Sequence, residues 1–180
     1  TTTCWGYLSE VNTPLKKKGQ RASVCMVGPR ERGERYIRMA SDLGVEDSIM
    51  FMGAVSPDRI QSLMRAANVV VLPSRHDGWG VVISEAIAVG KAIIASDRCG
   101  AALDLISPGI NGFLVKAGSV ESLAEAMAAY IQDPLLATRH SARSLELSHC
   151  VQPDSVGRLF EDAMVSWRQR WSGPCLAAEV

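Results

Sequence analysis

The chain has 180 residues, of which 47% are hydrophobic and 21% charged, a composition typical of one globular domain with a buried core. Lysine plus arginine and aspartate plus glutamate number 19 each, so the formal net charge is zero, which excludes the basic excess expected of a nucleic-acid-binding domain. The five cysteines include no Cys-x-x-Cys pair, which excludes a typical zinc site or disulfide framework and suits a reducing cytosol.

The chain shows neither a basic-then-apolar leader nor an apolar run of about 18 residues. We therefore expect a cytoplasmic protein that does not span a membrane. Peripheral contact with a membrane surface stays open.

Short apolar runs alternate with longer segments of helical periodicity along most of the chain. In chain order we expect a strand at residues 21–27, a helix at 31–43, a strand at 48–52, a helix at 56–66, a strand at 68–72, a helix at 81–89, a strand at 91–96, a helix at 101–106, a strand at 112–115, and helices at 119–132, 134–148 and 153–171. Gly44 and Gly90 end two of these helices, and Ser56 is placed to cap another.

The expected strands are continuous apolar runs, as at residues 69–72 and 92–95, which is typical of strands covered on both faces. Their alternation with helices indicates an α/β fold with a doubly wound parallel sheet in a single domain over residues 1–180. Ligands of such sheets bind past the carboxyl ends of the strands. The segments to consider are therefore residues 28–29, 53–54, 73–80 and 96–100.

Residues 73–86 hold the most informative pattern: a strand end, a loop with Gly78 and Gly80, and then the start of a helix. Glycine lets a ligand approach the backbone closely. The free amides and positive dipole end of a helix start favour an anion, for which a diphosphate is the natural candidate. The alternative is a tight turn that binds no ligand.

Two carboxylates flank this turn. Glu85 lies in a helix that is otherwise almost entirely apolar, so we expect it to be buried and to need hydrogen-bond donors such as a ribose diol. The alternative is that it reaches solvent or caps a backbone amide. Asp77 is placed to point into the same crevice, with a turn residue bonded to its own backbone as the alternative.

Asp77 and Glu85, with seven residues between them, resemble the Glu-x7-Glu motif of retaining glycosyltransferases of the GT-B fold. The wider pattern over residues 20–145 is similar to glycosyltransferase family 4. The matching segments are Pro73-Ser74, Gly78-Trp79-Gly80, Glu85-Ala86, Gly90, Gly100, Asp104 and residues 109–115, with Val27-Gly28 and Phe51-Met52-Gly53 upstream.

The resemblance implies the Rossmann-like C-terminal half of a GT-B fold and a role for each matching residue. Glu85 corresponds to the glutamate that binds the ribose of the donor, and Asp77 to the acid that contacts the donor sugar. The turn implied to hold the sugar and diphosphate comprises Gly78, Trp79, Gly80, Val81 and Val82. The residues implied to line the nucleotide pocket are Gly28, Pro29, Gly53 and Ala54.

The implied activity is transfer of a sugar from a UDP- or GDP-sugar donor, with retention at the anomeric carbon, to a glycan or lipid-linked acceptor at the inner face of a membrane. No metal or other cofactor is implied, and the sequence has no Asp-x-Asp pair to hold one.

Several positions depart from the family pattern. Asp77 replaces the commoner glutamate and is one methylene shorter, and Ala101 replaces the second glycine of a usual pair. Lys18-Gly19 looks like a family lysine but lies too close to the first strand. We therefore expect the chain to begin inside the donor domain, to lack the N-terminal acceptor domain, and to transfer no sugar by itself.

Three rival functions stay open. The first is an epimerase or phosphorylase-like enzyme of the same fold. The second is a non-enzymatic module that binds a nucleotide sugar, and the third is a dinucleotide-binding dehydrogenase domain. The glycine spacing of residues 28–33 does not fit the dinucleotide-binding pattern, which disfavours the last of these.

Overall fold

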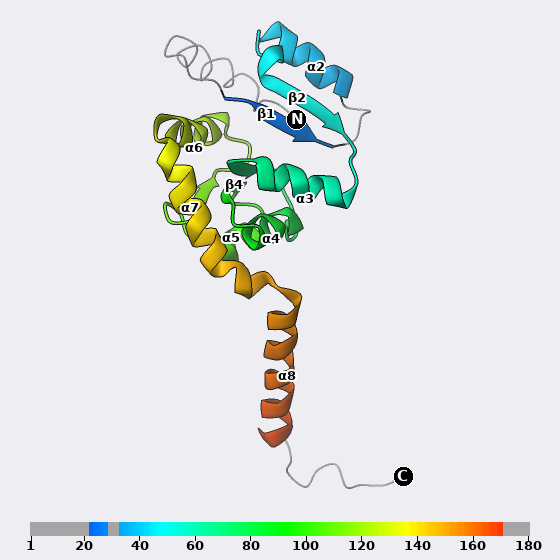
Figure 1. The fold of residues 1–180 in the computed structure, drawn as a ribbon, viewed down its shortest axis with the longest axis vertical. Coiled ribbons are helices and arrows are strands. Elements are labelled where there is room, and N and C mark those ends of the chain that lie inside the picture. The colour runs from blue at the N-terminus through cyan, green and yellow to red at the C-terminus, as the bar shows by residue number, and fades with distance from the viewer. Residues whose placement is uncertain (1–21, 29–32, 171–180) are drawn as a thin grey trace.

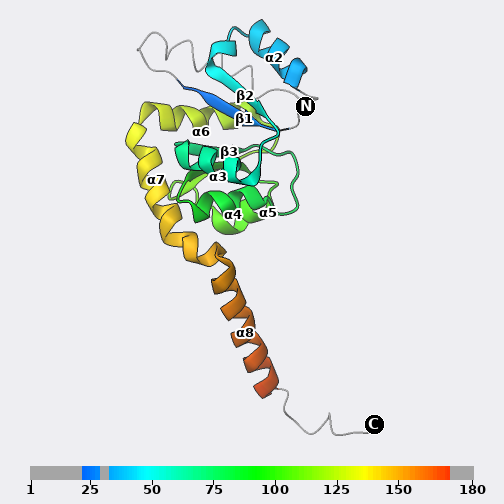
Figure 2. The same cartoon turned by 45° about the vertical axis from the view of Figure 1, so that its right-hand side comes forward.

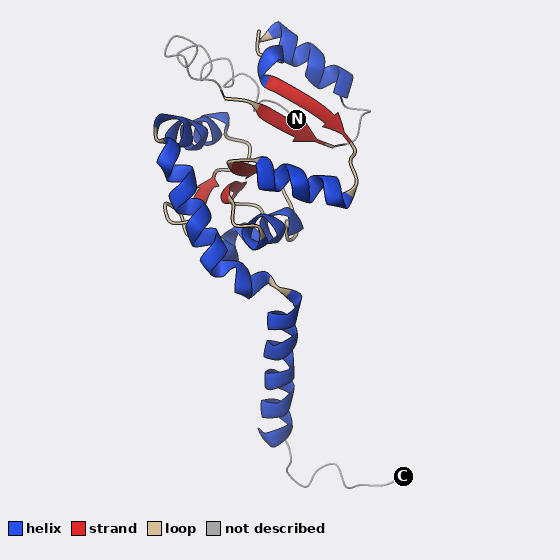
Figure 3. Cartoon of the chain, in the orientation of Figure 1, coloured by secondary structure: helices blue, strands red, loops and turns tan. Residues whose placement is uncertain are grey.

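The computed structural model describes residues 22–28 and 33–170, in which helices and parallel strands alternate (Figures 1 and 3). The strands are β1 (Val24–Val27), β2 (Ile49–Gly53), β3 (Val69–Leu72), β4 (Ala92–Ser96) and β5 (Gly112–Val115). The α-helices are α2 (Gly33–Asp42), α3 (Pro57–Ala66), α4 (Val81–Ala88), α5 (Gly100–Leu105), α6 (Val120–Gln132), α7 (Pro134–Leu147) and α8 (Pro153–Arg170), with short 3₁₀ segments η2 (Glu46–Ser48) and η3 (Ser148–Val151). Each strand and α-helix lies within the segment that the sequence predicts or shifts from it by one to three residues, whereas the two 3₁₀ segments were not predicted.

The described strands form two parallel sheets. In the described residues β1 pairs with β2, while β4 pairs with β3 on one side and β5 on the other. The α/β class, the parallel direction of the strands and the helical cover are confirmed. Among the described strands, neither β1 nor β2 pairs with a strand of the second sheet.

The three-stranded sheet carries the core, and β4 lies at its centre with all five residues buried. Its alternate side chains enter two different clusters, as the continuous apolar run predicts. Ile93 packs with Ile83 and Ile87 of α4 and with α5 on one face. Ile94 packs on the other face against Leu123 of α6 and the start of α7.

The two-stranded sheet has a smaller core of its own. Ala40 of α2 and Val45 are buried against side chains of β1 and β2. Met127 of α6 packs against this cluster and also against the core of the larger sheet, which joins the two layers seen in Figure 2.

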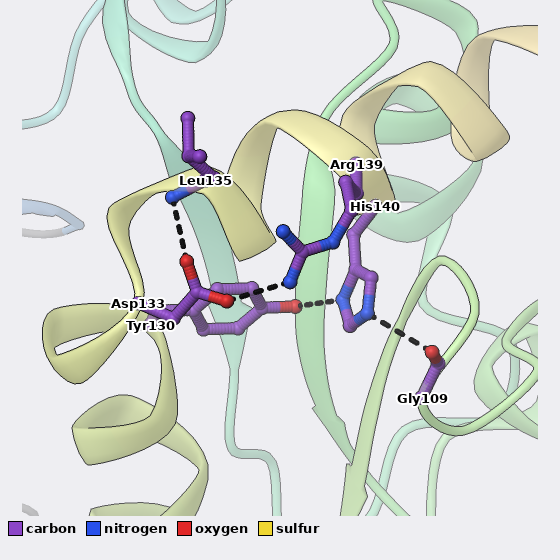
Figure 4. A network of polar contacts seen from close by, with 6 residues as sticks. All are labelled: Gly109, Tyr130, Asp133, Leu135, Arg139 and His140. Carbon is purple, nitrogen blue, oxygen red and sulfur yellow. Dashed lines mark hydrogen bonds and ion pairs between the residues drawn. The ribbon is translucent and has the colours of Figure 1, made fainter.

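A polar network fixes α6 against α7 (Figure 4). The Tyr130 hydroxyl lies 2.8 Å from Nδ1 of the buried His140, and His140 Nε2 lies 3.1 Å from the carbonyl oxygen of Gly109. A carbonyl only accepts, so Nε2 carries the hydrogen and Tyr130 donates to Nδ1. Asp133 caps α7 through the amide of Leu135 at 3.0 Å.

Helix α8 runs away from the other elements (Figures 1 and 2). It exposes four large apolar side chains, those of Phe160, Met164, Val165 and Trp167. Within residues 22–28 and 33–170, no helix is both long enough and apolar enough to cross a membrane.

Candidate functional site

The loop after β3 is held in place by the turn that follows β4. Asp77 donates its amide to the carbonyl of Arg98 at 3.0 Å, and Ala101 donates its amide to the carbonyl of Trp79 at 2.7 Å. A Cβ atom added to Gly100 would lie 2.6 Å from the carbonyl oxygen of Gly78, closer than real contacts allow. The two loops therefore touch backbone to backbone, which fixes the course of residues 77–80.

Gly80 turns the chain from this loop into α4. It precedes the first helical residue with φ +84°, in the left-handed region that favours glycine. A Cβ atom there would also lie 3.2 Å from Leu72 Cδ2 and 3.3 Å from Ile83 Cδ1. The glycine at this position is therefore favoured by the backbone conformation, and the packing leaves little room for a larger side chain.

The start of α4 presents unpaired backbone donors. Ile83 donates its amide to Gly80, whereas the amides of Val81 and Val82 have no recorded acceptor in the described part of the chain, as expected for the first residues of a helix. Trp79 and Val81 are 47% and 60% exposed, so this end of the helix is open to solvent. These amides, with the helix dipole behind them, suit an anionic group.

Glu85 is exposed, and the prediction that it is buried is wrong. Only one side of α4 packs on the sheet, through Ile83, Ala86 and Ile87. Val81, Glu85 and Ala88, at i, i+4 and i+7, lie on the opposite, solvent-facing side. The low polarity of the helix therefore does not force its carboxylate inward, and the Glu85 carboxylate has no hydrogen-bond partner among residues 22–28 and 33–170.

Asp77 forms a turn with its own loop. Its Oδ1 accepts the amide of Trp79 at 3.2 Å, which is the alternative that the sequence left open. The side chain is half-buried, and its second carboxylate oxygen has no recorded partner in the described residues. The turn thus holds the carboxylate beside residues 78–80 and leaves one oxygen free to accept a hydrogen bond.

The predicted nucleotide-pocket residues gather at the carboxyl ends of β1 and β2. Gly28 donates its amide to the carbonyl of Gly53 at 3.0 Å. Gly53 has φ +68°, and the next residue, Ala54, is exposed. Pro29 lies outside the described residues. Gly28, Gly53 and Ala54 are therefore brought together as one group, on a different sheet from Asp77 and Glu85.

A surface hollow lies at the carboxyl ends of β3, β4 and β5, on the α6 side of the sheet. Its lining residues are Pro73, Arg75, Ser96, Val115, Lys116, Gly118, Ser119, Val120 and Leu123. The segments predicted from the sequence, residues 73–80 and 96–100, include Pro73, Arg75 and Ser96 but not the residues after β5. The signal that could have found them is the capped start of α6, where Ser119 Oγ accepts the amide of Ser122 at 3.1 Å.

The described residues contain no group of three or more His, Cys, Asp or Glu side chains that could hold a metal ion. Arg75 and His76, which precede the turn, are both exposed. The chemistry available around the turn is therefore that of backbone amides, two carboxylates and nearby cationic side chains.

Comparison with known proteins places these features in a family. The model of the glycosyl transferases group 1 family matches residues 7–145, which include every described site residue named above. The lipopolysaccharide core biosynthesis mannosyltransferase LpcC of Rhizobium leguminosarum bv. viciae is 42% identical over 102 residues. That match covers 57% of this chain and 28% of the relative, so the matched region spans less than a third of that enzyme.

Solved structures share the fold. The C-terminal domain of a group 1 glycosyl transferase (LpcC) from Francisella tularensis superposes with a TM-score of 0.66 and 26% identity, covering 79% of this chain and 75% of that domain. Anabaena Alr3699/HepE, crystallised in complex with UDP and glucose, superposes with a TM-score of 0.72 and 21% identity, covering 92% of this chain and 46% of that protein. The α/β architecture is thus that of a GT-B glycosyltransferase C-terminal domain.

Proposed function

Because this chain belongs to the glycosyl transferases group 1 family, we propose that it is the donor-binding domain of an enzyme that transfers sugar from a nucleotide diphosphate sugar. The observation that carries the proposal is the open start of α4. Gly80 in a left-handed conformation leaves the amides of Val81 and Val82 pointing out of an exposed helix end. Such an end binds the diphosphate of the donor through its amides and its dipole.

The two carboxylates take the hydroxyl groups of the donor in this proposal. Glu85 lies one turn further along α4 than Val81, on the same solvent-facing side, where it can accept hydrogen bonds from the ribose. Asp77 has one carboxylate oxygen committed to the amide of Trp79, and the other is directed to the donor sugar. The exposure of Glu85 suits a residue that meets its partner only when the donor is bound.

The base is proposed to bind at the ends of β1 and β2. Gly28, Gly53 and Ala54 offer backbone atoms without large side chains there, and Pro29 follows in the sequence. Backbone donors and acceptors suit either uracil or guanine. The UDP held by HepE supports a uridine nucleotide, and a guanosine nucleotide is the alternative.

We further propose that transfer retains the configuration of the anomeric carbon and needs no metal ion. The amides at the start of α4 then stabilise the departing diphosphate, with help from cationic side chains near the turn. Neutralising the leaving group is the task that a metal ion performs in other enzymes, and preorganised amides perform it without reorganisation.

The acceptor is proposed to be a glycan or a lipid-linked sugar, in line with the lipopolysaccharide core enzyme among the relatives. The chain spans 46% of the HepE protein that it matches. We propose that a further domain of the whole enzyme binds the acceptor, and that the enzyme works in the cytoplasm in contact with the inner face of a membrane.

Titration calorimetry with UDP and with GDP tests the proposal. One of the two is expected to bind, and the matching nucleoside monophosphate is expected to bind at least tenfold more weakly, because it lacks the second phosphate. A folded sample that gives no heat with either diphosphate contradicts the assignment. Tight binding of a nicotinamide dinucleotide would favour the dehydrogenase alternative instead.

A further inference from the structure

Ser96, the last residue of β4, lies directly behind the proposed donor turn without being part of it. Its side chain is fully buried. A buried hydroxyl is costly unless it is hydrogen-bonded, so its partners show what it does for the fold.

The first partner is the strand end that leads into the turn. The Ser96 hydroxyl donates to the carbonyl oxygen of Ser74. The pairing of β3 with β4 stops at Leu72, which lies opposite Ala95, and the next residue, Pro73, has no amide to continue the ladder. The hydroxyl therefore extends the attachment of the β3 segment by two residues beyond the point where backbone pairing ends.

The second partner is the loop that follows β4. Since the single hydroxyl hydrogen goes to Ser74, Ser96 Oγ acts as the acceptor for the amide of Arg98 at 3.3 Å. The thiol of the buried Cys99, 3.5 Å away, is then the donor in its contact with Ser96 Oγ. All the hydrogen-bonding capacity of the hydroxyl is used.

These contacts hold the donor turn at its entry and in its middle. Ser74 begins the loop that carries Asp77, and the carbonyl of Arg98 accepts the amide of Asp77 at 3.0 Å. The same loop after β4 brings Gly100 against the carbonyl of Gly78 and binds the carbonyl of Trp79 through Ala101. One buried hydroxyl thus links the entry of the turn to the loop that supports its middle.

We infer that Ser96 is a positioning residue for the donor: it sets the affinity for the nucleotide diphosphate by fixing residues 74–80, although it touches no ligand itself. The inference rests on the proposed function. A turn that loses this link must be ordered at the moment of binding, and that ordering weakens binding.

The test compares Ser96→Ala with Ser141→Ala, a matched control in α7 whose hydroxyl contacts the same strand. Ser141 Oγ accepts the amide of Ala92 at 3.0 Å, so it attaches the opposite, amino end of β4. Calorimetric titration with UDP and GDP is expected to show about a tenfold higher Kd for Ser96→Ala and an unchanged Kd for Ser141→Ala. Ser96→Cys, which keeps a weaker donor, is expected to lie between Ser96→Ala and the parent, and it replaces Ser96→Ala if that variant does not fold.

Amide hydrogen exchange without nucleotide separates this inference from the proposed function. The Asp77 and Ala101 amides are expected to exchange at least tenfold faster in Ser96→Ala than in the parent and in Ser141→Ala. If the parent binds nucleotide and both serine variants bind and exchange like it, the inference is overturned while the proposed function stands. If the parent binds neither nucleotide, the proposed function fails, and Ser96 retains only a role in ordering the turn.

Discussion

Replacing Glu85 by alanine should separate stability from ligand binding. The Glu85 carboxylate is exposed and has no hydrogen-bond partner in the described residues, so its removal should change the free energy of unfolding by no more than about 0.5 kcal/mol. In the donor complex the same carboxylate accepts hydrogen bonds from the ribose. Loss of a hydrogen bond to a charged group costs about 1.5–3 kcal/mol, which corresponds to about a 10- to 150-fold higher Kd.

Urea denaturation and calorimetric titration on the same samples measure both quantities. Glu125→Ala is the matched control, because Glu125 is also an exposed glutamate in a helix but lies on α6. The reasoning is refuted if Glu85→Ala binds the nucleotide as tightly as Glu125→Ala. A loss of more than about 1.5 kcal/mol of stability would also refute it, by showing that Glu85 supports the fold.

Three further predictions concern the fold around the site. Gly80→Ala should lower the free energy of unfolding by about 1–2 kcal/mol, because alanine is disfavoured at φ +84°. Gly78→Ala is the control and should cost less, because no atom lies near its added Cβ. Equal losses of stability for the two variants in urea denaturation would contradict this. Ser144→Ala should raise the free energy of unfolding by about 1 kcal/mol in the same assay, because the buried Ser144 hydroxyl has no hydrogen-bond partner in the described residues. A decrease in the free energy of unfolding would show that the hydroxyl does have a partner. Burial lowers the pKa of His140 below its ordinary value of 6.5, so the unfolded chain takes up the proton more readily than the folded protein, and stability is lost as the pH falls below about 6.5. The difference in the free energy of unfolding between the parent and His140→Gln should therefore shrink from about pH 7.5 to about pH 5. A difference that stays constant would count against the buried neutral imidazole.

The sequence predicted most of the fold because the local signals agree with one another. The continuous apolar run of β4 predicts a strand covered on both faces, and Ile93 and Ile94 do enter opposite cores. Gly44 and Gly90 lie at helix ends with φ +62° and +65°, as their positions in the pattern indicate. The division into two sheets was not predictable, since alternation of strands and helices specifies their direction but not which strands pair.

The local structure around the candidate site was predicted in part. The turn between β3 and α4 follows from the two glycines at a strand-to-helix junction, whereas the left-handed conformation of Gly80 comes from the structure. The exposure of Glu85 did not follow, because composition alone does not show that α4 buries only one side. The link through Ser96 was also missed, since a serine at the end of an apolar strand carries no signal of the carbonyl and amide that it joins.

The central claim is that a nucleotide diphosphate rests on the backbone amides where α4 begins, and nitrogen-15 NMR of the chain titrated with UDP or GDP tests it directly. The account predicts that the amide resonances of Trp79, Val81 and Val82 shift most and saturate together with the binding measured by calorimetry. It is contradicted if the nucleotide binds while those three resonances stay in place and the shifts gather elsewhere, for example along α8.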